Sequence, residues 1–91
     1  MVIDKEVIVV TNAVKKLTVP AAAQSAIIQA QVDGVRFWLD GSVPTAAEGQ
    51  MLAVNTSIII TCREDLLNFK AFRITNDATV TVQYRNTPGL A

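Results

Sequence analysis

Apolar and polar residues alternate with a period of two along much of this 91-residue chain. In segment 26–32, alanine, isoleucine and valine occupy the even positions, and two glutamines stand among the odd ones. Segments 35–39 and 79–84 show the same alternation. Because successive side chains of a β-strand point to opposite faces of its sheet, this period predicts half-buried strands.

Further strands are predicted where β-branched residues gather, at 5–11, 15–19, 51–54, 57–62 and 69–75. Turn-forming residues separate the strands at intervals of roughly eight to twelve residues, which is typical of an antiparallel sandwich or a small barrel. We therefore expect one all-β domain over residues 1–91. Its predicted form is a single antiparallel β-sandwich, jelly-roll-like, of seven or eight short strands.

Two short polar connections are predicted to be hairpins. Asp33-Gly34 stands between two strand-like runs, and such a pair is the strongest short hairpin signal. Asn76-Asp77 joins the last two predicted strands in a similar way. Helix is expected only as single turns, one after Pro20 and one at Arg63–Leu66, so that less than about a tenth of the chain is helical.

Composition excludes several classes of function. The eight basic and eight acidic residues cancel, so neither a nucleic-acid footprint nor a polybasic membrane patch is expected. The chain contains no histidine, the commonest general base and metal ligand. Its one cysteine, Cys62, has no partner for an internal disulfide, and we expect it to be a buried small apolar residue.

The stretch "VRFWLDGSVPTAAEG", residues 35–49, carries the residues closest to an active-site pattern. Asp40 as a base beside Ser42 or Thr45 as a nucleophile would need a further group to orient the base. No histidine is present, and the lysines stand in other segments. The sequence favours a turn in which Asp40, Ser42 and Thr45 bond the backbone, and we expect no catalytic residue and no enzyme activity.

Metal and cofactor sites are not expected either. The acids available for calcium lack the spacing of an EF-hand loop; they are Asp40, Glu48, Glu64 and Asp65. Trp38 and Tyr84 stand near arginines and are candidates for stacking on a sugar or a base. A role in the core or in a subunit interface is commoner for aromatic residues of a small β domain.

Two strands are apolar on both faces. In "EVIVV", Val7 and Val9 alternate with other β-branched residues, and in "SIIIT" Ile59 lies opposite its two neighbours. A strand that is apolar on both faces must be covered on both, and a thin domain of this size offers little second cover. The sequence therefore predicts a homo-oligomer. Its candidate interface residues are Val7, Val9, Ile58, Ile59, Ile60 and Trp38.

Residues 24–86 resemble small virion proteins of tailed bacteriophages and prophages. The runs "VRFWLDGSVPTAAEGQML" and "LLNFKAFRITNDATVTVQY" carry the resemblance: an aromatic strand, a "DG-x-x-PT-x-x-x-G" loop, a "DL-x-x-F" segment and a closing hairpin. Segment 1–23 departs from the pattern and is expected to reach a neighbouring subunit. The tail at 87–91 is expected to be frayed.

The resemblance implies a non-enzymatic β-sandwich of the capsid decoration, cement, head-fibre or tail accessory type. It implies a place in the virion after synthesis in the host cytoplasm. The implied partners are further copies of the chain, as a trimer, and the major capsid protein or another virion protein. The alternative is a small binding module of a phage tail or head fibre that uses Trp38 and the 40–49 loop to hold a host-surface carbohydrate.

Overall fold

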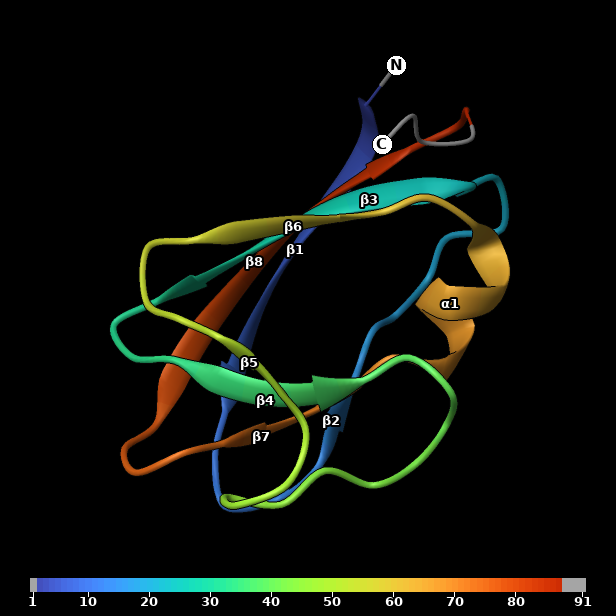
Figure 1. Cartoon of the computed structure of the whole chain (residues 1–91). Coiled ribbons are helices and arrows are strands. Elements are labelled where there is room, and N and C mark those ends of the chain that lie inside the picture. The colour runs from blue at the N-terminus through green and yellow to red at the C-terminus, as the bar shows by residue number, and fades with distance from the viewer. Residues whose placement is uncertain (1, 88–91) are drawn as a thin grey trace.

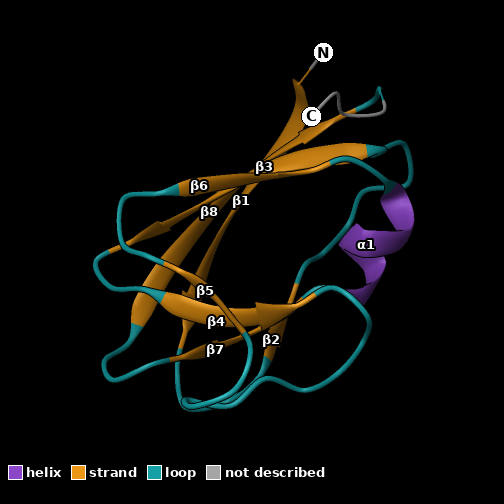
Figure 2. Ribbon diagram, in the orientation of Figure 1, coloured by secondary structure: helices purple, strands orange, loops and turns teal. Residues whose placement is uncertain are grey.

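The computed structural model describes residues 2–87. They form two four-stranded antiparallel sheets stacked as two layers, with one short helix at the end of the stack (Figures 1 and 2). Sheet A has the order β1-β8-β3-β6, and sheet B has the order β2-β7-β4-β5. The elements are β1 (Val2–Val10), β2 (Lys15–Lys16), β3 (Ser25–Gln31), β4 (Val35–Trp38), β5 (Gln50–Leu52), β6 (Ser57–Ile60), α1 (Arg63–Asn68), β7 (Lys70–Arg73) and β8 (Ala78–Arg85).

The strand order is that of an eight-stranded jelly roll. The first strand pairs with the eighth, the second with the seventh, the third with the sixth and the fourth with the fifth. These pairs describe one long antiparallel ribbon, β1 to β4 against β5 to β8. Folding the ribbon over itself adds the pairs β3·β8 and β4·β7, which complete the two sheets. The predicted antiparallel sandwich of short strands is confirmed.

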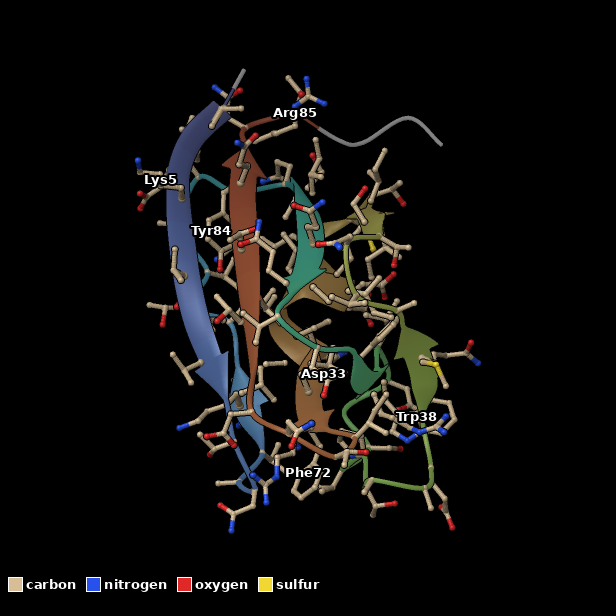
Figure 3. The ribbon with its side chains drawn as sticks, turned by 90° about the vertical axis from the view of Figure 1, so that its left-hand side faces the viewer. Lys5, Asp33, Trp38, Phe72, Tyr84 and Arg85 are labelled. Carbon is tan, nitrogen blue, oxygen red and sulfur yellow. The ribbon has the colours of Figure 1, made fainter. Side chains whose placement is uncertain are left out.

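The predicted hairpin at Asp33-Gly34 is wrong. β3 belongs to sheet A and β4 to sheet B, so this connection carries the chain from one layer to the other (Figure 3). Val32 makes the turn with a φ of 72°. A Cβ added at Gly34 would lie 2.9 Å from the carbonyl oxygen of Leu52, so the chain passes where a side chain does not fit. The true hairpin tip of the ribbon is the long 39–49 connection between β4 and β5.

The connection at Asn76-Asp77 is a second crossover rather than a hairpin, because β7 lies in sheet B and β8 in sheet A. Arg73 forms a salt bridge with Asp77, with Nη1 2.7 Å from Oδ1. Asn76 Nδ2 donates a hydrogen bond to Asp33 Oδ2 at 3.3 Å, which links this crossover to the first one. Both crossovers therefore meet at the same end of the sandwich.

The core lies between the inner faces of the two sheets. Its buried apolar residues are Val10, Ala23, Ala26, Ile28, Ala30, Val35, Phe37, Leu52, Ile60, Leu66, Phe69, Ala71, Ala78, Val80, Val82 and Tyr84. The rings of Phe37 and Phe69 stack with centroids 5.7 Å apart, which joins sheet B to the segment after α1. The other residues of this buried set are aliphatic, so these two rings and Tyr84 supply its aromatic side chains.

α1 closes one end of the sandwich and buries Leu66. The predicted turn at Arg63–Leu66 is confirmed and extends to Asn68; its six residues are less than a tenth of the chain. Nη1 of Arg63 donates to the carbonyl oxygens of Pro20 at 2.7 Å and Ala23 at 2.8 Å. The same 20–23 segment forms the expected loose turn, closed by a bond from the Ala23 amide to the Pro20 carbonyl.

Cys62 is exposed, so the prediction that it is buried is wrong. It stands at the N-cap of α1 with extended φ and ψ angles. Ile60 takes the inward position at the end of β6, and the chain has already left the sheet when it reaches Cys62.

Candidate functional site

The outer face of sheet A is a regular grid of side chains fixed by strand register. Its central row runs from Val7 through Thr81 and Gln29 to Ser57, across all four strands. The row has an apolar end on β1 and a polar centre.

Two further rows flank the central one. The first runs from Lys5 through Gln83 and Ile27 to Ile59. The second runs from Val9 through Thr79 to Gln31. The polar residues therefore gather over the middle strands, and the exposed apolar residues lie mainly toward the two edge strands.

A shallow concavity of about 440 Å³ lies on this outer face. Its lining includes three glutamine amides and two hydroxyls, contributed by Gln29, Gln31, Gln83, Ser57 and Thr81. Gln31 Nε2 donates to Gln29 Oε1 at 3.1 Å, so neighbouring amides in the lining are already ordered. These five residues offer neutral hydrogen-bond donors and acceptors, and Lys5 and Glu6 add one charge of each sign to the lining.

The apolar residues at the edges of the grid are exposed. Val7 is 66% exposed, Val9 55% and Ile59 51%. Ile58 packs against the core from its partly buried position and Ile60 is buried, so Ile59 is the isoleucine that β6 presents outward. The two-sided apolar pattern in β1 and β6 therefore places one set of side chains in the core and the other in solvent.

β1 is an edge strand of sheet A, and no described strand lies on its far side (Figure 3). Alternate residues of an edge strand direct their N–H and C=O groups away from the sheet, which gives a template for pairing with another chain. At nine residues, β1 is the longest strand of the described chain. The open edge and exposed Val7 and Val9 are parts of the same strand.

A partly buried polar contact holds β1 against the sandwich. The hydroxyl of Tyr84 donates to Glu6 Oε1 at 2.6 Å, and the Thr18 amide donates to the same oxygen at 3.0 Å. Burial raises the pKa of Tyr84, and its hydrogen bond to Glu6 and the negative charges of Glu6 and Asp4 raise it further. Sequence reasoning missed this contact, because nothing in the spacing of Glu6 and Tyr84 indicates that their strands are neighbours.

The 40–49 loop has the turn chemistry that the sequence predicts. Asp40 Oδ1 accepts a hydrogen bond from the Ser42 amide at 2.9 Å. This bond, together with one from the Ser42 side chain, lowers the pKa of Asp40. Thr45 Oγ1 accepts from the amides of Ala47 at 3.3 Å and Glu48 at 3.0 Å. The side chains of Asp40 and Thr45 thus organise the backbone of the loop.

Two cations on the outer face of sheet B hold this loop. Arg36 donates through Nε to the Ala46 carbonyl at 3.2 Å and through Nη1 to the Gly49 carbonyl at 3.1 Å. Lys70 Nζ donates to the Gly41 carbonyl at 2.8 Å. Trp38 stands opposite Lys70 in the register of β4 and β7 and is half-buried.

The structure does not bring the predicted interface residues onto one face. Val7, Val9 and Ile59 lie on the outer face of sheet A, whereas Trp38 belongs to sheet B (Figure 3). Within residues 2–87, no group of three or more histidine, cysteine or acidic residues is placed to hold a metal ion. No helix in that same range has the length and apolar character needed to cross a membrane.

No family model, no curated protein and no solved structure matches this chain.

Proposed function

We propose that the protein is a non-enzymatic structural component of a larger protein assembly and that it self-associates through sheet A. The observation that carries the proposal is the exposure of Val7, Val9 and Ile59 on the two edge strands of that sheet. A sheet face that contacts only solvent normally carries polar residues at such positions. Complete burial of one such side chain contributes about 1.5 to 3 kcal/mol, so their burial offsets part of the free-energy cost of association.

The resemblance to tailed-phage virion proteins supplies the kind of assembly. On this proposal the protein decorates or cements the virion, and its partners are other copies of itself and the major capsid protein or another virion protein. The jelly-roll strand order supports the proposal by analogy, because this fold recurs in viral capsid domains. The analogy concerns fold, and the residues of sheet A carry the argument for association.

Light scattering on charged variants tests the self-association. Replacing Val7 and Ile59 together with aspartate places two charges on the outer face and leaves the core untouched. We expect the wild type to be an oligomer and V7D/I59D to be a folded monomer with an unchanged far-UV circular dichroism spectrum. Val43→Asp is the matched control, because Val43 is 59% exposed in the 40–49 loop; it should leave the oligomer intact. A monomeric wild type at tens of micromolar would refute the proposal.

Electron microscopy of particles assembled with and without the protein tests the virion role. The expected result is extra density on the particle surface that appears with the wild type and is lost with V7D/I59D. Particles that show no bound protein at any ratio would contradict a decoration or cement role, even if the isolated protein is oligomeric.

A second candidate function is the binding of a neutral carbohydrate. The observation that favours it is the concavity of sheet A, whose amides and hydroxyls match the hydrogen-bonding groups of a sugar. Jelly rolls also occur in lectins. The sequence alone favours Trp38 and the 40–49 loop as the place for a sugar, and Trp38 belongs to the other sheet. Glycan-array binding abolished by Gln29→Ala would favour the concavity, and binding abolished by Trp38→Ala would favour the loop.

A further inference from the structure

We propose that two copies of the chain associate by antiparallel pairing of their β1 strands about a two-fold axis at Val7. This inference rests on the proposed self-association and names a contact for it at the β1 edge of sheet A; Ile59, on the opposite edge strand β6, lies outside that contact. The two copies of sheet A then form one continuous eight-stranded sheet across the axis.

The regular part of β1 sets the centre of the contact. Pairing between β1 and β8 is continuous from Asp4 to Val10, and a register shift between Val2 and Asp4 ends it. The midpoint of the continuous part is Val7. A two-fold axis at that residue uses the whole regular edge of both copies and leaves the irregular end outside the contact.

Charge excludes two alternative registers and is compatible with this one. In an antiparallel pair, side chains that stand directly opposite each other point to the same side of the sheet. The outer faces of the two copies therefore lie on the same side only when the two-fold axis passes through a residue position and not between two residues. An axis at Lys5 or Glu6 sets that charge opposite its own copy, which is destabilising. An axis at Val7 sets Val7 opposite itself, Lys5 opposite Val9 and Glu6 opposite Ile8. In this register the alkyl stem of Lys5 covers Val9, which is 55% exposed in the single chain.

The β1 edge pairs better with the β1 edge of a second copy than with the β6 edge of one. A three-fold ring would need β1 of one copy to pair with β6 of the next, and β6 offers four residues against nine. More than half of β1 would then keep an open edge. The two-fold contact covers the regular part of β1 completely, and such isologous contacts are the commonest in homo-oligomers.

Disulfide trapping tests the register. In a Cys62→Ser background, which removes the exposed native thiol, Val7→Cys places two cysteines directly opposite each other. Their Cα atoms are then about 4.5 to 5.5 Å apart, within the range for a disulfide. With diamide as oxidant we expect most of the C62S/V7C chains to become covalent dimers. C62S/V9C should stay uncrosslinked, because the two Val9 positions lie four residues out of register, about 13 Å apart.

Mixing C62S/K5C with C62S/V9C gives an independent readout, since this register places Lys5 opposite Val9. The expected product is the mixed dimer in large excess over either self-crosslinked species. An oligomer in which V7C does not crosslink, or in which V9C crosslinks with itself as readily, would overturn the β1 contact and leave the proposed self-association standing. A wild-type chain that sediments as a monomer would overturn both.

Discussion

The hydroxyl of Tyr84 donates a 2.6 Å hydrogen bond to Oε1 of Glu6, and this bond fastens the edge strand β1 to the interior of the sandwich. Tyr84 is 1% exposed and Glu6 is half-buried, so the contact lies at the border between core and solvent. The Thr18 amide reaches the same carboxylate oxygen from the chain between β2 and β3. The strand proposed to mediate association is therefore anchored from two directions.

Replacing Tyr84 with phenylalanine should lower the free energy of unfolding by about 1 to 2 kcal/mol, because a hydrogen bond to a charged group is lost while the ring stays in place. Urea unfolding followed by circular dichroism measures the change. Glu6→Gln is the control: its amide oxygen still accepts from the tyrosine, so its loss should be smaller than that of Y84F. An equal stability of Y84F and the wild type would contradict the role assigned to this bond.

The raised pKa of Tyr84 predicts a specific pH dependence. Below the ordinary tyrosine pKa of 10.0, folded and unfolded chains both keep this proton, and stability does not depend on it. Above that pH the unfolded chain releases the proton while the folded chain retains it, so the free energy of unfolding falls as pH rises. Y84F should lack this component. Unfolding curves of both proteins from pH 8 to pH 11 should converge at the alkaline end; parallel curves would contradict the prediction.

Val32 holds a φ of 72°, a left-handed conformation that β-branched residues rarely adopt, and its side chain is 78% exposed. Asparagine tolerates this conformation better, so Val32→Asn should raise the free energy of unfolding by about 1 kcal/mol. Val43→Asn is the matched control, since Val43 is also exposed and has a negative φ. Thermal unfolding should show a higher midpoint for V32N alone, and a lower midpoint for V32N than for wild type would refute the assignment of strain.

The same connection shows why sequence reasoning recovered the strands and missed part of their topology. Alternation located β3, β4 and β8, because burial of one face acts on each strand separately. The pairing of β3 with β8 and β6 depends on contacts between distant segments, which a local signal such as Asp33-Gly34 does not contain. The turn residues marked where the chain leaves each strand, but the hairpin predicted at Asp33-Gly34 is wrong, because local turn chemistry does not fix whether the next strand stays in the same sheet.

For the candidate surface, the sequence separated the two faces of β1 and β6 but not which face points outward. The predicted interface set held Ile59, which is exposed, together with Ile58 and Ile60, which face the core. Trp38 was grouped with them as an aromatic candidate, and the register shows that it lies on the other sheet. The concavity is lined by residues of all four strands of sheet A, which the fold brings together, so single-strand patterns do not reveal it.

The loop from Asp40 to Gly49 should tolerate loss of its serine hydroxyl better than loss of its threonine hydroxyl. Ser42 is held chiefly through its backbone amide, whereas Thr45 Oγ1 accepts two amide hydrogen bonds. Ser42→Ala should change the free energy of unfolding by less than about 0.5 kcal/mol, and Thr45→Ala should lower it by about 0.5 to 1 kcal/mol. Thr45→Ser should restore the wild-type value, and neither alanine change should alter the oligomeric state.

Sedimentation equilibrium of the wild-type protein over a concentration series reaching tens of micromolar tests the central claim most directly, because it measures the mass of the associated species without any substitution. Association through β1 predicts a reversible equilibrium between one chain and two, with the dimer dominant at the upper end of the series and abolished by Val7→Asp. A mass equal to one chain throughout the series would contradict self-association. The protein would then have to act by binding a carbohydrate at the concavity of sheet A or by binding a different partner.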